Sequence, residues 1–94
     1  MDNNFEILGK VVEFLGSKAI SEKSTKEDYL VEYGKPDKQG RKNNAVVSVF
    51  SFCKNKYQIK NIETGESYKF TLCVDGRQLQ SGKWVNNLKV LNIQ

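Results

Sequence analysis

A strict alternation of apolar and polar residues restricts the fold of this chain more than any other feature. In residues 66–75, the apolar side chains Tyr68, Phe70, Leu72 and Val74 alternate with polar or small ones. Successive side chains of a β-strand point to opposite faces, so this stretch predicts a strand with one buried and one solvated face. The four apolar residues are expected in the core.

Four further stretches have strand-like patterns, and polar, mostly glycine-bearing segments separate them. Gly9 interrupts the first stretch, which predicts a bend or bulge that lets one strand serve two sheets. In the last stretch the apolar positions change phase before Leu91, which predicts a bulge or barrel corner. These stretches are residues 5–15, 28–33, 45–52 and 83–93.

Two long polar segments and one helical window connect the strands. Residues 16–27 are almost entirely polar and are predicted to form a long mobile loop. Residues 34–44 contain the only proline and two glycines, which predicts a long hairpin loop. Residues 53–62 place Ile59 and Ile62 three apart, which predicts a short helix that ends before the next glycine.

Three strands, a short helix and two more strands, with a bent first strand, is the order of the OB-fold. This fold is a mostly-β, five-stranded Greek-key barrel with a helix between its third and fourth strands. A sheet sandwich with the helix docked on one face is the structural alternative. The 94 residues are enough for one modest core, so residues 1–94 are predicted to form one domain.

Several short motifs also resemble a known group of proteins. They are residues 6–11 (EILGKV), residues 64–66 (TGE), Arg77, Gly82-Lys83-Trp84 and Asn87. In order and spacing they resemble a family of small bacterial domains grouped with the single-stranded DNA-binding-protein-like OB-folds. The resemblance covers nearly the whole chain. It implies an OB-fold above all, although this chain has Cys53 where a Trp is expected after the third strand.

Positive charge is concentrated in the middle of the chain, although the net charge is only +4. Residues 1–34 carry four basic and seven acidic residues, residues 35–60 carry seven and one, and residues 61–94 carry four and three. A phosphate backbone is the commonest partner of such a patch, and a solvated lysine-rich surface is the alternative. Its cations are Lys35, Lys38, Arg41, Lys42, Lys54, Lys56 and Lys60.

An OB-fold binds single strands across its second and third strands, where aromatic side chains stack on bases. Tyr33 and Trp84 stand at strand ends beside charged residues, which favours exposure, whereas Phe50 is assigned to the core. For Phe52 and Trp84, the alternative to a stacking role is a position in the barrel core. The predicted nucleic-acid-binding residues are Tyr33, Lys35, Lys38, Arg41, Lys42, Phe52, Arg77, Lys83 and Trp84.

The remaining aromatic and basic residues receive structural or minor roles. Tyr29, Tyr68 and Phe70 are predicted in the core, and Tyr57 is predicted at the bottom of the barrel. The lysines of residues 16–27 are expected to contribute little to binding, because acidic residues beside them dilute their field. They are Lys18, Lys23 and Lys26.

Several function classes are disfavoured. The chain has no histidine and no CxxC pair, so a metal site is not indicated, and Cys53 and Cys73 are predicted to be reduced and unbridged. The sequence shows neither a paired-acid site nor a phosphate-binding glycine loop, so an enzyme, a cofactor or a small-molecule substrate is not indicated. No apolar run approaches the ~18 residues of a membrane span, and no signal peptide is evident. A soluble, cytoplasmic protein without a membrane partner is expected.

The leading hypothesis is a sequence-tolerant binder of single-stranded nucleic acid, acting in replication, repair or recombination of a bacterium or phage. Base stacking and neutralisation of the backbone are its mechanism, with DNA favoured over RNA and a homo-oligomer as a further partner class. The alternative is a protein-interaction or assembly OB-fold that pairs its sheet edges with another chain and binds no nucleic acid.

Overall fold

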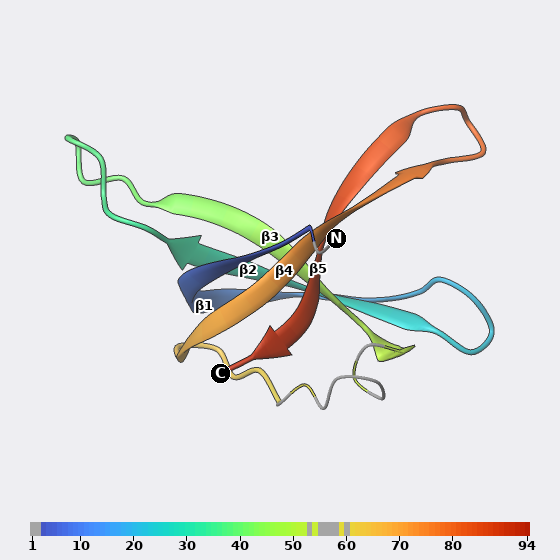
Figure 1. Cartoon of the computed structure of the whole chain (residues 1–94), viewed down its shortest axis with the longest axis horizontal. Coiled ribbons are helices and arrows are strands. Elements are labelled where there is room, and N and C mark those ends of the chain that lie inside the picture. Colours follow the sequence, from blue (N-terminus) through green and yellow to red (C-terminus); the bar gives the residue numbers. More distant parts are fainter. Residues whose placement is uncertain (1–2, 53, 55–58, 60) are drawn as a thin grey trace.

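Five strands close into a barrel in the computed structural model, which describes residues 3–52, 54, 59 and 61–94. The order around the barrel is β1-β2-β3-β5-β4, the order of an OB-fold (Figure 1). The predicted five-stranded barrel is therefore confirmed. The strands are β1 (Asn4–Ala19), β2 (Thr25–Tyr33), β3 (Asn43–Phe50), β4 (Ser67–Gln78) and β5 (Trp84–Ile93).

The first strand bends at Gly9, as predicted. Gly9 lies opposite Tyr33 of β2 on one side and opposite Tyr68 of β4 on the other, so β1 changes partner strand at this residue. A Cβ atom here would lie 2.2 Å from Cγ1 of the buried Val31. Only glycine therefore fits at the corner where one strand joins both halves of the barrel.

The core contains the inward-facing residues of all five strands. The predicted core positions Tyr29, Phe50 and Phe70 are buried, and Tyr68 packs partly buried against the core. Val74 was also expected in the core and is instead 58% exposed, because β4 leaves the barrel after Leu72. The principal core cluster is Val11, Tyr29, Val31, Val47, Val49, Phe70, Leu72, Val90 and Ile93.

The predicted long mobile loop of residues 16–27 is wrong. Gly16 to Ala19 pair with Asp28 to Thr25, so most of this segment is an extension of β1 and β2, called here the 1–2 ribbon (residues 16–28). Its residues Lys26 to Asp28 also pair with β3. Backbone hydrogen bonds hold such a ribbon without a buried face, so its sequence needs no apolar alternation. β4 and β5 extend in the same way, and residues 74–88 are called the 4–5 ribbon.

Both ribbons project from the same side of the barrel, and residues 34–42, called the 2–3 loop, project from the opposite side (Figure 1). The 2–3 loop is the predicted hairpin connection. Asp37 organises it, because its carboxylate accepts hydrogen bonds from the backbone N–H groups of Gln39 at 2.9 Å and Arg41 at 2.8 Å. The cations of the 2–3 loop therefore lie at the end of the barrel opposite to the ribbons.

The helix between β3 and β4 begins earlier than predicted. Ser51 and Phe52 are helical rather than part of β3, and Lys54 is helical as well. Ile59 and residues 61–63 are not helical, and the side chains of Ile59 and Ile62 pack against the core without a helix. The predictions for Cys53 and Tyr57, and most of the predicted helix over residues 53–62, lie outside the described residues.

Two irregularities complete the barrel. Leu72 lies opposite Val90 and Thr71 opposite Asn92, so Leu91 is an extra residue in β5 and the predicted bulge is confirmed. β3 and β5 are parallel and are joined by two residue pairs, Val47 with Leu88 and Ser48 with Lys89. Within the described part of the chain, no helix is long and apolar enough to cross a membrane.

Candidate nucleic-acid interface

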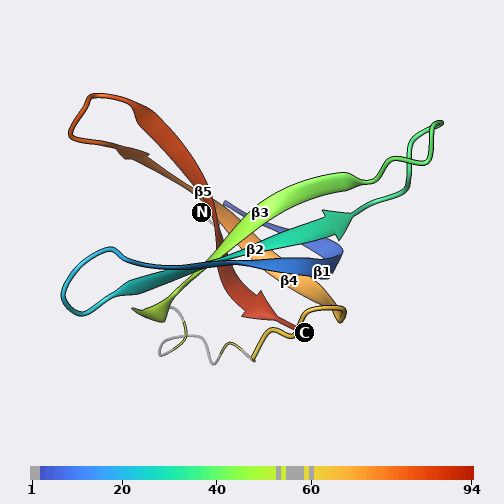
Figure 2. The ribbon, with the colours of Figure 1, turned by 180° about the vertical axis from the view of Figure 1, so that it is seen from behind.

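A groove of about 560 Å³ lies between the two ribbons. Figure 2 shows the ribbons diverging from the same side of the barrel. The floor of the groove is Phe50, at the end of β3, and the walls come from the two ribbons. The groove is lined by Lys18, Ala19, Ile20, Lys26, Phe50, Arg77, Leu79, Val85 and Asn87.

Strand register explains why these side chains meet. Lys26 pairs with Lys18 on one side and with Phe50 on the other, and paired residues share a face of a sheet. Arg77 pairs with Val85 on the facing wall. Lys18, Lys26 and Phe50 therefore share one face, and Phe50 is nonetheless buried because Arg77 and Phe52 cover its ring.

Two cations of this region lie over aromatic rings. The guanidinium of Arg77 is 5.6 Å from the ring centre of Phe50, and Nζ of Lys89 is 5.3 Å from that of Phe52. The two rings are themselves 5.9 Å apart. Phe50 is 1% exposed, whereas Phe52 is 43% exposed. Phe50, the floor of the groove, thus lies beside the exposed Phe52 ring, and each ring has a cation over one side.

Acidic residues neutralise part of the groove's positive charge. Lys26 lies 3.6 Å from Asp28, and Nε of Arg77 donates to Asp75 at 2.9 Å. Asp28 is held in place by the buried Ser48, whose hydroxyl donates to it at 2.7 Å. Among the described residues, Lys18 has no carboxylate within 4.0 Å and is an unpaired cation of the groove.

A polar cluster fixes the helical segment after β3 to β2. Lys54 and the hydroxyl of Tyr29 both donate hydrogen bonds to Glu27. Burial alone would raise the pKa of Glu27, but these hydrogen bonds and the Lys54 charge outweigh it and hold the pKa below 4.5. Burial, followed by the neighbouring Glu27, raises the pKa of Tyr29. Because Phe52 is only two residues from Lys54 in the chain, this cluster helps to position the Phe52 ring.

The predicted site residues fall into two separate groups. Tyr33 at the end of β2 is half-buried, and the four cations Lys35, Lys38, Arg41 and Lys42 belong to the 2–3 loop, at the end opposite to the groove. Arg41 is paired with Asp37 at 3.0 Å, and Lys42 lies 3.5 Å from Glu32. Half of the loop's cations are therefore already matched by carboxylates.

The other predicted residues lie at the ribbon side. Arg77 lines the groove, and Phe52 stands beside Phe50. Lys83 and Trp84 are at the tip of the 4–5 ribbon. Trp84 is 68% exposed, so the core alternative is wrong for it. Trp84 pairs with Gln78, whereas Arg77 pairs with Val85, so the Trp84 ring lies on the ribbon face opposite to the groove.

Sequence reasoning missed several groove residues. Lys18 and Lys26 were given a minor role, Phe50 was assigned only to the core, and Lys89 was not singled out. β1 has two register shifts against β2, between Val11 and Glu13 and between Phe14 and Gly16, and each changes which residues share a face. A bulge pattern in β1 was the one signal that could have placed Lys18 on the groove side.

The groove offers cations and aromatic rings rather than metal ligands. Within the described ranges of the chain, no three His, Cys, Asp or Glu side chains come together as a metal site would require. Cys73 is a half-buried free thiol on β4.

Comparison with known proteins supports the fold. No protein-family model matches the sequence, and no curated protein sequence matches it. Among solved structures, the chain is similar to the dimeric N-terminal domain of PriB protein from Thermoanaerobacter tencongensis. The identity is 16% and the TM-score 0.69, over 98% of this chain and 93% of that one. The likeness confirms the OB-fold that the sequence motifs implied.

Proposed function

We propose that this OB-fold binds single-stranded nucleic acid in the groove between its ribbons, with little preference for sequence. The observation that carries the proposal is the exposed Phe52 ring beside Phe50, the floor of a groove that Lys18, Lys26 and Arg77 line. OB-folds bind single strands over strands two and three, between the loops that follow strands one and four. The groove occupies that position.

The cations over the rings suggest how binding proceeds. In the free protein Arg77 and Lys89 cover Phe50 and Phe52. A cation–π contact at an exposed site contributes about 0.5–1 kcal/mol, whereas a stacked base contributes about 1–3 kcal/mol. A strand that places a base on Phe52 and phosphates near Arg77 and Lys89 therefore replaces a weaker contact by a stronger one.

The composition of the groove favours binding without sequence readout. Among the described residues of the lining, Asn87 is the only one with a side-chain amide, and the other walls are aliphatic or cationic. Reading a sequence requires several donors and acceptors matched to base edges, whereas stacking accepts every base. Trp84, exposed on the ribbon face away from the groove, remains a predicted further contact. The 2–3 loop cations lie at the opposite end of the barrel, and we expect them to contribute less to binding.

The wider context of the proposal follows from the sequence and from the fold. A bacterial or phage protein of replication, repair or recombination, acting on DNA in the cytoplasm, fits the small basic OB-fold. The PriB domain of similar fold is dimeric, which supports a homodimer here. We infer a binding protein and not an enzyme, because the groove holds no pair of groups suited to acid–base or nucleophilic catalysis.

A protein-interaction module is the second candidate, and one observation favours it. Val74 and Trp84 are strongly exposed on the same face of the 4–5 ribbon, away from the groove. Exposed apolar side chains that gather on one surface are typical of protein interfaces. Such a module would bind a partner chain through this face and leave nucleic acid unbound.

Fluorescence anisotropy separates the two candidates. A labelled thymidine oligonucleotide of about 25 nucleotides is longer than the ~4–16 that one OB-fold covers. We expect it to bind more tightly than a duplex of equal length, with affinity that falls as salt rises from about 50 to 200 mM. Lack of binding to single strands at micromolar protein and low salt would refute the nucleic-acid function and leave the interaction module.

A further inference from the structure

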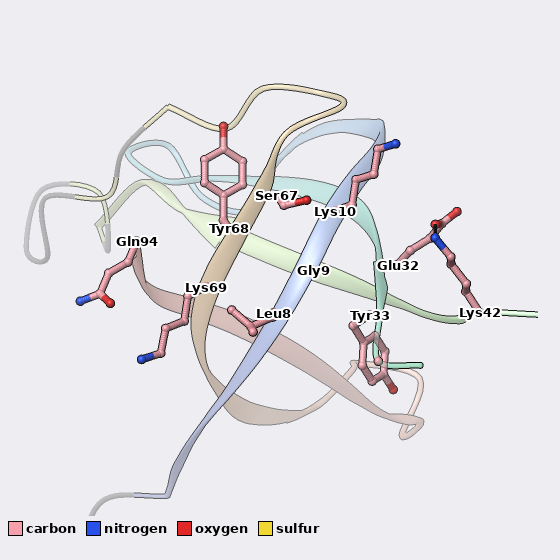
Figure 3. A pocket seen from close by; sticks show the side chains of 11 residues that line it. Leu8, Gly9, Lys10, Glu32, Tyr33, Lys42, Ser67, Tyr68, Lys69 and Gln94 are labelled. Atoms are coloured by element: carbon pink, nitrogen blue, oxygen red, sulfur yellow. Dashed lines mark ion pairs between the residues drawn. The ribbon is translucent and has the colours of Figure 1, made fainter. Parts of the chain in front are cut away.

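A second pocket of about 410 Å³ lies at the other end of the barrel, on the outer face of β4, β1 and β2. It surrounds the corner of β1, where Leu8 and Gly9 form its centre (Figure 3). The start of the 2–3 loop and the last residue of the chain complete its rim. It is lined by Leu8, Gly9, Lys10, Glu32, Tyr33, Gly34, Lys42, Ser67, Tyr68, Lys69 and Gln94.

The charges of this pocket favour an anion. Three lysines and one glutamate line it. Lys42 lies 3.5 Å from Glu32, and Lys69 lies 2.9 Å from Glu6 outside the pocket. Lys10 has no carboxylate within 4.0 Å in the described part of the chain. The pocket therefore keeps an excess of positive charge after its internal ion pairs are counted.

Its centre favours a flat apolar group. Leu8 is 73% exposed, although leucine is usually buried, and its side chain lies between Lys69 and Lys10 in the close view (Figure 3). The backbone of Gly9 and the ring of Tyr33 line the pocket beside it. Cations around an exposed apolar centre suit the phosphates and base of a nucleotide.

We propose that this pocket is a second contact for the strand that occupies the groove, an inference that rests on the proposed function. Lys10 and Lys69 contact phosphates, and Leu8 contacts a base or sugar. Lys10 and Lys69 both lie outside the 2–3 loop, which the sequence analysis identified as basic. The protein then holds a long strand at two ends of the barrel and a short strand only in the groove.

The outer face of β2 connects the two sites. Lys26 lines the groove, Glu32 lines the second pocket, and Asp28 and Leu30 lie between them on the same face. Six residues of strand span about 20 Å. Val46, opposite Leu30, is 45% exposed and gives this path an apolar middle. A strand long enough to cross it gains affinity from the second contact, because the first contact raises its local concentration.

The test compares two oligonucleotide lengths and two charge-matched variants. Thymidine oligomers of about 6 and about 25 nucleotides lie within and beyond the span of one OB-fold groove. The Lys10→Gln/Lys69→Gln variant removes two charges from the second pocket. The Lys35→Gln/Lys38→Gln variant removes two charges from the 2–3 loop, whose Lys35 and Lys38 do not line the pocket. Leu8→Ser alters the apolar centre without changing charge.

We expect Lys10→Gln/Lys69→Gln to weaken binding of the long oligomer about tenfold and to lower its salt slope by about 1.4, since each phosphate contact on a single strand contributes about 0.7. Binding of the short oligomer should change less than about twofold. Leu8→Ser should weaken the long oligomer alone, with the salt slope unchanged. Equal losses in the two charge-matched variants, or equal losses for both oligomers, would overturn the second contact.

The outcome also distinguishes this inference from the function on which it rests. If the wild-type protein binds the short oligomer and Lys10→Gln/Lys69→Gln binds the long one as tightly as wild type, the groove stands and the second contact is wrong. If the wild-type protein binds neither oligomer, the proposed function is wrong and the second contact falls with it.

Discussion

The two ends of the barrel carry similar numbers of cations and use them differently. In the 2–3 loop, Arg41 is paired with Asp37 and Lys42 with Glu32, and the ion pairs help to shape an exposed loop. At the groove, Arg77 and Lys89 lie over the rings of Phe50 and Phe52. Cations thus help to shape an exposed loop at one end of the barrel and lie over aromatic rings at the other.

This difference shows why the charge of a segment is a poor guide to the charge of a site. Residues 35–60 carry seven of the fifteen basic residues and only one acidic residue. Their described cations are divided between the 2–3 loop and Lys54, which is engaged with Glu27. The groove takes its cations from β1, β2 and β4, where acidic residues stand nearby in the sequence. A site is defined by the face that its residues share.

The largest expected effect concerns stability at the groove end. Phe50 is both the floor of the groove and a fully buried side chain, so Phe50→Ala should lower the free energy of unfolding by about 3–5 kcal/mol. Arg41→Ala, in the 2–3 loop, should change it by no more than about 0.5 kcal/mol. Urea denaturation followed by circular dichroism measures both. A loss below about 1 kcal/mol for Phe50→Ala would show that the groove floor does not belong to the core.

The next effect concerns base stacking. Phe52→Ala should weaken single-strand binding by about 1–3 kcal/mol with an unchanged salt slope, because the ring contributes stacking and no charge. Phe14→Ala is the matched control, since Phe14 is similarly exposed but packs on Tyr29 away from the groove. Anisotropy titrations at several salt concentrations decide the matter. Equal effects of the two substitutions would remove Phe52 from the interface.

A smaller effect separates the cations of the two ends directly. Lys18→Gln/Arg77→Gln should weaken binding of a short oligomer about tenfold, whereas Arg41→Gln/Lys42→Gln should leave it within about twofold. Both double variants remove the same charge, so a general electrostatic effect would appear in both. A larger loss in the loop variant would place the main contact at the 2–3 loop and restore the interpretation based on segment charge.

The smallest effect is a pH dependence confined to the 2–3 loop. Asp37 accepts a hydrogen bond from the backbone N–H of Arg41, then one from Gln39, and these hold its pKa below the ordinary value of 3.8. A lowered pKa in the folded state means that the loop is stabilised above the unfolded-state pKa and loses this support as the pH falls through the folded-state pKa. NMR titration of the Asp37 carboxyl measures this, and a pKa at or above about 3.9 would contradict it.

The sequence was sufficient for the parts of the fold that have a buried face. Alternation identified β4, the phase change identified the bulge at Leu91, and Gly9 identified the corner of β1. Each of these features determines which side chains reach the core, so each leaves a periodic trace in the sequence. Tyr29 and Phe70 were assigned to the core because each is in phase with neighbouring apolar residues, and both are buried.

The ribbons and the groove left no such trace. Residues 16–19 and 25–28 are held by backbone hydrogen bonds between β1 and β2, and polar residues satisfy that arrangement as well as they satisfy a loop. Two bulges in β1 determine which face of the ribbon Lys18 occupies. The register of β4 and β5 places the side chains of Trp84 and Arg77 on opposite faces of the 4–5 ribbon. The sequence therefore named Arg77 and Phe52 among the binding residues but could not assign faces to their neighbours.

The short junction between β3 and β5 has a mechanical consequence. Nine residue pairs join β1 to β2, but only two join β3 to β5. Phe50 and Asn87 stand on the two sides of this thin link, just above it. A force that pulls the ribbons apart therefore acts first on the β3–β5 junction. The groove widens there while the other strand pairs of the barrel stay joined.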